Sequence, residues 1–115
     1  MQANEASAVL NREQLRDITM DDEELMREIL SALIDDTSRQ IHLLESAIRE
    51  QDSQKCARLA HYSKGACANV GAEGAALLLK QIERKALSGD FQECGSSLAA
   101  LTGEIDRLRT EIAVL

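Results

Sequence analysis

His61, Lys64 and Gly65 belong to one short stretch whose residue types and spacing could support chemistry. An imidazole nitrogen is a good nucleophile near neutral pH. On an α-helix, Lys64 lies on the same face as His61, where its ammonium group would stabilise an anion carried on the ring. Gly65 follows one turn after His61, at a position where any side chain would lean over the ring. The stretch therefore predicts a nucleophilic histidine with a cation beside it and open space above it.

The helix that would carry His61 has a single apolar side, and His61 is not on it. With about 100° between successive residues, the core-facing side is made of Cys56, Leu59, Ala60, Ser63, Cys67 and Val70. His61 projects from the flank with Ala57, Lys64, Gly65 and Ala68. Because most of these neighbours have very small side chains, we predict that Gly65, Ala57 and Ala68 form a docking surface around the histidine.

The motif His61-x-x-Lys64-Gly65, followed by Gly71, resembles the His-x-x-Lys-Gly-x-x-x-x-x-Gly signature of histidine-containing phosphotransfer (HPt) domains. The likeness in length and helix order extends over nearly the whole chain. It implies that His61 accepts a phosphoryl group from a receiver-domain aspartate or a kinase and hands it to another receiver, with Lys64 stabilising the phosphate. The implied partners are a response-regulator receiver domain and/or a hybrid sensor histidine kinase. No cofactor is implied on this chain, and Mg²⁺ is expected on the receiver partner only.

Glu83 is the residue that we expect to orient the imidazole. A histidine that is phosphorylated on Nε2 must hold its ring proton on Nδ1, against an acceptor. If the chain turns near Val70, an antiparallel helix places Glu83 about one turn beyond the level of His61, and the opposite leans of the two side chains bring them together. In HPt relatives the corresponding position, twenty-two residues after the histidine, often holds Gln or Glu, which Glu83 matches.

Length, composition and charge predict a small all-α protein with protein partners. The chain has 115 residues and no proline, and its apolar residues are mostly Ala, Leu and Ile. A net charge of −7 argues against nucleic-acid binding, which requires a basic face. No apolar run approaches the length of a membrane span, and the first ten residues lack the pattern of a signal peptide. We therefore expect a cytoplasmic protein, favour a monomer, and see no kinase or nucleotide-binding segment.

The three cysteines, Cys56, Cys67 and Cys94, are predicted to be small buried hydrophobic residues. Their number is odd, and no Cys-x-x-Cys pair is present. We therefore expect neither a disulfide framework nor a metal site.

The N-terminal part of the chain divides into a tail and a short helix. Residues 1–10 show no sustained pattern and are predicted to be a flexible tail, whereas 11–115 form a single helical domain. Asn11 is placed to cap a short helix. Through Leu15 and Ile18, that helix would form a lid on the rest of the domain.

Four longer helices follow, and their order predicts an up-down-up-down antiparallel four-helix bundle. Residues Thr19 to Asp22 resemble a capping box at the start of the first, Asp52 or Ser53 caps the second, and Asp90 caps the last. Gly71 allows a tight turn between the second and third. The first long helix has the apolar stripe Leu25, Ile29, Leu33, Thr37, Ile41, Leu44 and Ile48, and we expect it to be continuous despite the polar residues from Asp35 to Ser38. The third has Ala75, Leu78, Leu79, Ile82 and Ala86; the last has Phe91, Cys94, Leu98, Leu101, Ile105, Leu108, Ile112 and Leu115.

Other interpretations of these residues remain. His42 lacks the lysine and glycine that follow His61, and we interpret it as an ordinary surface histidine. Cys67 lies about 240° around the helix from His61, which is a poor geometry for a Cys–His dyad within that helix. The alternative function is a helical adaptor that docks a signalling partner without being phosphorylated. An enzyme with its own turnover is the third alternative, for which the sequence offers no nucleotide loop, metal set or carboxylate pair.

Overall fold

The computed structural model describes residues 9–115, and within that range the chain forms five helices and no strand. The helices are α2 (Arg12–Thr19), α3 (Glu23–Arg49), α4 (Ser53–Val70), α5 (Glu73–Leu87) and α6 (Phe91–Ala113). The predicted all-α class is therefore confirmed. Of the predicted tail, residues 1–8 lie outside the described part, and Leu10 is buried in the core.

Four of the helices begin at a polar side chain that replaces a missing backbone hydrogen bond. Asn11, Asp22, Asp52 and Asp90 each accept a hydrogen bond of 3.1 Å from the backbone N–H three residues further on. The predicted caps at Asn11 and Asp90 are confirmed. Of the two candidates for α4, Asp52 is the cap.

The predicted capping box at Thr19 is wrong. Thr19 is the last residue of α2, is buried, and donates its hydroxyl hydrogen bond to the carbonyl of Leu15 at 2.7 Å. Met20 and Asp21 then turn the chain in the left-handed conformation, with φ of 54° and 66°. The N-cap of the long helix α3 is therefore Asp22, three residues after the predicted cap, and the helix begins at Glu23. It continues without a break past Asp35, as predicted.

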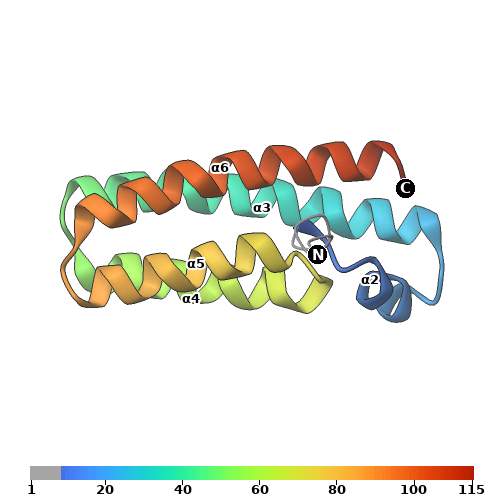
Figure 1. The fold of residues 1–115 in the computed structure, drawn as a ribbon, viewed down its shortest axis with the longest axis horizontal. Coiled ribbons are helices and arrows are strands. Elements are labelled where there is room, and N and C mark those ends of the chain that lie inside the picture. The colour runs from blue at the N-terminus through green and yellow to red at the C-terminus, as the bar shows by residue number, and fades with distance from the viewer. Residues whose placement is uncertain (1–8) are drawn as a thin grey trace, which may run out of the picture.

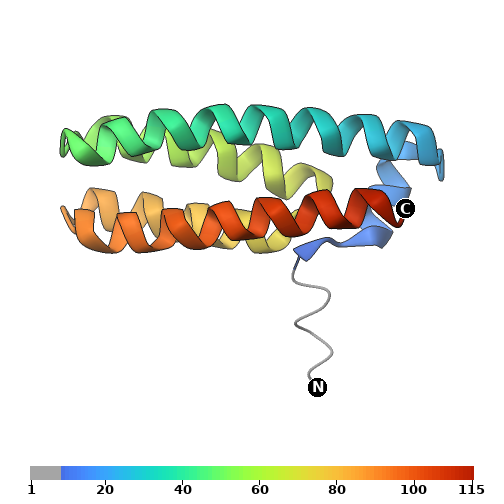
Figure 2. The same cartoon turned by 90° about the horizontal axis from the view of Figure 1, so that it is seen from above.

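The four longer helices lie side by side in two layers. Figure 1 shows α3 and α6 in one layer and α4 and α5 in the other, and Figure 2 shows the first of these layers from above. α3 packs against α4 and α6, and α5 packs against the same two helices. Successive helices run in opposite directions, as the colours in Figure 1 show. The short α2 lies across one end, against α3 and α4.

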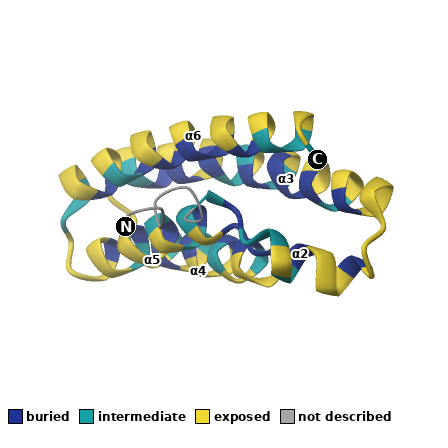
Figure 3. Ribbon diagram, turned by 45° about the vertical axis from the view of Figure 1, so that its right-hand side comes forward, coloured by how far each residue is buried: buried dark blue, intermediate teal, exposed yellow. Residues whose placement is uncertain are grey.

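The buried side chains form one core between the two layers (Figure 3). α3 contributes more residues to the core than its predicted stripe: Met26, Leu30, Leu33, Ile34, Thr37, Ile41, Leu44 and Ala47. Leu25 is exposed and Ile29 and Ile48 are half-buried. The reason is that α3 packs on two long neighbours at once, so a face wider than one stripe must be apolar. In α2, Leu15 is buried as predicted, whereas Ile18 is exposed.

The predicted stripes of α5 and α6 agree closely with the structure. Ala75, Leu79, Ile82 and Ala86 are buried in α5; Cys94, Leu98, Leu101, Ile105 and Leu108 are buried in α6. All three cysteines are buried free thiols. Within residues 9–115, no helix is long and apolar enough to cross a membrane.

Candidate functional site

The candidate site lies on α4 and α5, which form a closely packed helical hairpin. Both helices carry small, fully buried side chains, among them Ala60 of α4 and Ala75 of α5, and small buried side chains allow helices to approach closely. One end of the hairpin is closed by the turn between α4 and α5. At the open end, the hydroxyl of Ser53 donates a hydrogen bond to the carbonyl of Ala86. The hairpin is therefore fastened at both ends, so that side chains on the two helices meet in a fixed register.

Gly71 makes the turn between the two helices, and two features of the turn require glycine. Its φ of 89° lies in the left-handed region, which residues with a side chain rarely adopt. A Cβ atom at this position would lie 2.8 Å from the carbonyl oxygen of Asn11. The carbonyl of Gly71 also accepts a hydrogen bond of 2.7 Å from the backbone N–H of Asn11. The last glycine of the motif therefore positions the hairpin and does not take part in chemistry.

His61 and Glu83 meet across the hairpin, as the sequence predicts. Nδ1 of His61 lies 3.1 Å from Oε2 of Glu83. Since an ionised carboxylate only accepts hydrogen bonds, the neutral ring carries its proton on Nδ1 and leaves the lone pair on Nε2. The His61 side chain is 68% exposed, and no hydrogen bond within residues 9–115 engages Nε2. Nε2 is therefore open to attack an electrophile.

Lys64 contacts Glu83, a pairing that the sequence analysis did not identify. Its Nζ lies 2.8 Å from Oε1 of Glu83, so both carboxylate oxygens are engaged. The hydrogen bond from Lys64 lowers the pKa of Glu83. The partial burial of Glu83 opposes this shift, whereas the charge of Lys64 and the contact with His61 reinforce the shift. The opposite charges were a signal available in the sequence, but the pairing depends on how α4 and α5 are aligned.

Gly65 is exposed and has helical backbone, which agrees with the open space predicted there. A Cβ atom added at Gly65 would have no neighbour within 4 Å. The expectation that any side chain at this position crowds the ring is therefore wrong for a methyl group. The physical reason is that His61 leans toward the start of its helix and is held by Glu83, away from residue 65.

The two predicted docking alanines differ in their exposure. Ala68 is exposed, and its carbonyl accepts a hydrogen bond of 2.8 Å from the side chain of Gln14. Ala57 is only 8% exposed, so its predicted place on the exposed flank is wrong. It is buried because α5 covers this side of α4. It nevertheless lines a groove of about 540 Å³ beside His61, together with Gln54, Arg58, Tyr62, Glu83 and Leu87. The docking roles of Gly65, Ala57 and Ala68 stay predictions.

Ser63 and Cys67, two residues near His61 that could suggest chemistry, face the core. Ser63 is 1% exposed and points inward, as predicted, and its hydroxyl has no hydrogen-bond partner among residues 9–115. Burial raises the pKa of the Cys67 thiol to about 11, and the hydroxyl of Thr37 lies 3.9 Å from its sulfur. A buried, protonated thiol is a poor nucleophile. Within residues 9–115, no cluster of three or more His, Cys, Asp and Glu side chains could hold a metal ion.

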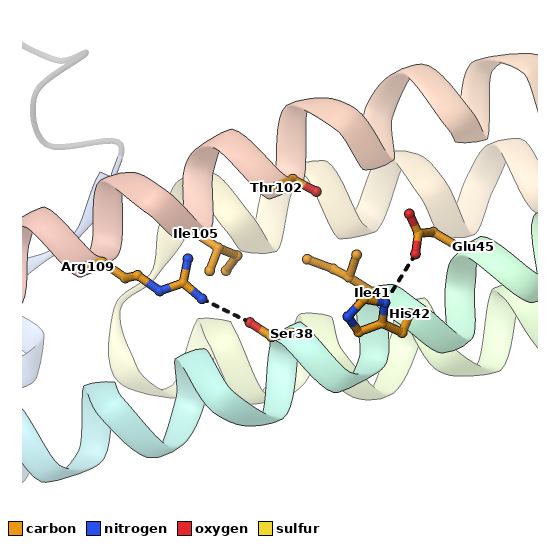
Figure 4. A pocket seen from close by; sticks show the side chains of 7 residues that line it. All are labelled: Ser38, Ile41, His42, Glu45, Thr102, Ile105 and Arg109. Carbon is orange, nitrogen blue, oxygen red and sulfur yellow. Dashed lines mark hydrogen bonds and ion pairs between the residues drawn. The ribbon is translucent and has the colours of Figure 1, made fainter.

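His42 lies on α3, on the opposite layer of the molecule. It lines a small pocket between α3 and α6, together with Glu45 and Arg109 (Figure 4). The volume of this pocket is about 180 Å³. Nδ1 of His42 lies 3.3 Å from Oε1 of Glu45, three residues further along the same helix. The contact resembles that of His61, but no lysine holds Glu45 and no neighbouring helix supplies the carboxylate.

The sequence profile of the Hpt domain matches residues 28–111, which is most of the chain. The chain belongs to the Hpt domain family. It is therefore a histidine-containing phosphotransfer intermediate of phosphorelay signalling, and Hpt domains are not themselves kinases. Hpt domains interact with receiver domains and histidine kinases in these relays.

Two solved structures have the same fold as this Hpt domain. Histidine-containing phosphotransfer protein B (HptB) from Pseudomonas aeruginosa PAO1 superposes with a TM-score of 0.83 at 23% identity, over 91% of each chain. A putative histidine-containing phosphotransfer protein from rice superposes with a TM-score of 0.82 at 19% identity, over 95% of this chain and 80% of that one. No curated protein sequence matches the chain.

Proposed function

We propose that His61 is the residue that carries the phosphoryl group, on Nε2. The observation that carries this proposal is the 3.1 Å contact between Nδ1 and Glu83, which leaves Nε2 as the nucleophilic nitrogen on an exposed face. His42, the other histidine, shares none of the interhelical contacts that hold the His61 ring.

The transfer step requires no cofactor on this chain. The Nε2 lone pair attacks the phosphorus of a phosphorylated aspartate on a receiver domain, and a P–N bond forms. The P–O bond to the aspartate breaks, and its electron pair leaves with the aspartate carboxylate. The Nδ1 proton stays in place, so the ring becomes positively charged as the new bond forms. Glu83, at 3.1 Å, stabilises that charge in the same way as the carboxylate in a catalytic triad. The reverse reaction returns the phosphoryl group to a receiver.

Lys64 has two functions in this proposal. Through its 2.8 Å contact it holds Glu83 in the position that orients the ring. Its positive charge, one helical turn from His61, also favours the negatively charged phosphoryl group. Because the lysine is already paired with a carboxylate, we expect this second contribution to be the smaller one.

The remaining features of the fold complete the proposal. We infer that α3 to α6 form an up-down-up-down antiparallel four-helix bundle with α2 as its lid, and that residues 11–115 act as one domain. The partners are a response-regulator receiver domain and/or a hybrid sensor histidine kinase, with Mg²⁺ bound by the receiver. A cytoplasmic location and a monomeric state stay predictions.

The deciding experiment is to incubate the protein with a receiver domain that has been phosphorylated in its own Mg²⁺-containing buffer. We expect label to move to this chain and to be lost in acid but retained in alkali, as for a phosphorylated imidazole. Peptide mapping should place the label on His61. Binding of the receiver without transfer of label would instead favour the adaptor function.

A further inference from the structure

Arg58 is a second cation beside His61, and it has no partner in the described part of the chain. It lies three residues before His61 on α4, and both residues line the same groove. Residues three apart on a helix share a face. Arg58 is exposed, and within residues 9–115 no ion pair or side-chain hydrogen bond engages its guanidinium group. The groove therefore contains an arginine whose donors are free.

The direction in which His61 points brings its ring toward this arginine. Helical side chains lean toward the start of the helix and cover the preceding turn. The lining of the groove agrees with that lean, because Gln54, Ala57 and Arg58 all precede His61 on α4, whereas of the α4 residues after His61 only Tyr62 lines it. Lys64 lies on the other side of His61, in the following turn. The two cations therefore flank the histidine from opposite ends.

The charges at the site show why a second cation is needed. Lys64 and Glu83 form an ion pair at 2.8 Å and neutralise each other. A phosphoryl group on Nε2 brings close to two negative charges at neutral pH, whereas the ring contributes one positive charge. The phosphorylated site thus keeps a net negative charge that Lys64 cannot balance without releasing Glu83. A guanidinium group with free donors is suited to this task, since its planar fork matches two phosphoryl oxygens.

We propose that Arg58 binds the phosphoryl group on His61, donating hydrogen bonds from its guanidinium group to the phosphoryl oxygens. This proposal rests on the proposed function, because it requires His61 to be the phosphorylated residue. Lys64 then serves mainly to position Glu83, and Arg58, on the other side of His61, binds the phosphoryl anion.

The experiment compares the wild-type protein with three variants, each phosphorylated with phosphoramidate in the absence of any receiver. Arg58→Gln removes the guanidinium group, and Arg58→Lys retains the charge without the planar fork. Arg84→Gln is the matched control: Arg84 is an exposed arginine on α5 that does not line the groove, and its replacement changes the net charge equally. The phosphoryl group of each protein is titrated with pH by phosphorus NMR.

We expect the phosphoryl pKa to rise by about 0.5 to 1 in Arg58→Gln, because a nearby cation favours the more highly charged form. Arg58→Lys should show a smaller rise, and Arg84→Gln should match the wild type. Transfer from a phosphorylated receiver should fall about 3- to 10-fold in Arg58→Gln and by less in Arg58→Lys, whereas Arg84→Gln should transfer at the wild-type rate. Identical titration curves for wild type and Arg58→Gln would overturn the role of Arg58 while leaving phosphorylation of His61 intact. Failure of the wild type to acquire a phosphohistidine at all would instead overturn the proposed function itself.

Discussion

The two histidines of this protein each contact a glutamate through Nδ1, yet their surroundings differ. His61 meets Glu83 from a neighbouring helix at 3.1 Å, and Lys64 holds the other carboxylate oxygen. His42 meets Glu45 on its own helix at 3.3 Å, with no lysine bound to that carboxylate. The Glu83 side chain is 21% exposed, whereas that of Glu45 is 52% exposed.

The comparison shows that a histidine–carboxylate contact does not by itself make a site. A carboxylate on the same helix moves with the histidine and is free to rotate into water, so it restricts the ring only weakly. A carboxylate from a second helix that is also paired with a lysine fixes both the tautomer and the orientation of the ring. The His42–Glu45 pair on α3 is therefore a matched control for the His61–Glu83 pair on α4 and α5.

Replacing the histidines should have the largest effect. We expect His61→Gln to abolish acceptance of a phosphoryl group and His42→Gln to leave it within about twofold of wild type. Both variants should melt close to the wild-type temperature, because both side chains are exposed. The measurement is acid-labile label after incubation with a phosphorylated receiver. Label retained in His61→Gln, or lost in His42→Gln, would remove the distinction between the two histidines.

Side chains at Gly65 should separate function from stability. Gly65→Ala should raise the free energy of unfolding by about 0.5–1 kcal/mol, because an exposed helical glycine is replaced by the best helix former. Transfer should nevertheless fall from Gly65 to Ala to Leu, since a receiver needs the open space beside His61.

Gly103, on α6 at the His42 side of the molecule, is the control for Gly65. It too is a helical glycine where a Cβ atom would have no neighbour within 4 Å. Gly103→Ala and Gly103→Leu should change stability in the same way without affecting transfer. Equal transfer rates for Gly65→Leu and Gly103→Leu would show that open space at residue 65 is not needed for docking.

Replacing the two carboxylates should have an intermediate effect. We expect Glu83→Ala to slow transfer roughly 10-fold without abolishing it, because the nucleophile remains while the ring loses its orientation. Glu45→Ala should transfer at the wild-type rate. Nitrogen NMR of the neutral wild-type protein should show the proton of His61 on Nδ1. A neutral ring with an unprotonated Nδ1 would exclude Glu83 from the proposed step.

The smallest expected effect is a change in stability at acid pH. The pKa of Glu83 is lowered from its ordinary value of 4.5 in the folded protein, first by the hydrogen bond from Lys64. The stabilisation is therefore present above the unfolded value and is lost as the pH falls through the folded value. We expect Glu83→Gln to lower the free energy of unfolding by less than about 1 kcal/mol at pH 7, and by less still at pH 3.

A second background tests the cause of this pH dependence. In a Lys64→Met background, the free energy of unfolding that is lost on Glu83→Gln should differ less between pH 7 and pH 3. Urea unfolding at the two pH values measures this loss. If the difference is as large with Met at position 64, Lys64 is not what lowers the pKa of Glu83.

Much of the fold could be predicted from local sequence signals. The caps at Asn11 and Asp90 and the turn at Gly71 depend on a few adjacent residues, and all three are observed. The buried residues of α3 were predicted less well, because contacts with α2 and with two flanking helices decide which side of its first turns is buried. Leu25 and Met26 are equally apolar, and only tertiary packing decides that Met26 is the buried one.

The site could be predicted where one helix decides it, and less well where two helices meet. The exposure of His61 and the inward direction of Ser63 follow from the period of α4 alone. The contact with Glu83 could be predicted because the tight turn at Gly71 fixes how the two helices are aligned. The pairing of Lys64 with Glu83 and the burial of Ala57 depend on the distance between α4 and α5 and on rotamers, which no sequence period specifies.

The contact between α2 and the turn at Gly71 has a consequence for how the domain should be delimited. The Hpt profile begins at residue 28, after α2 has ended. A fragment trimmed to the profile would lose the Asn11 donor to the Gly71 carbonyl and the Gln14 donor to the Ala68 carbonyl. The last turn of α4 would then be exposed to solvent, and its amide protons should exchange faster. Truncation at the profile boundary would therefore loosen the hairpin that holds His61 opposite Glu83, although neither residue would be removed.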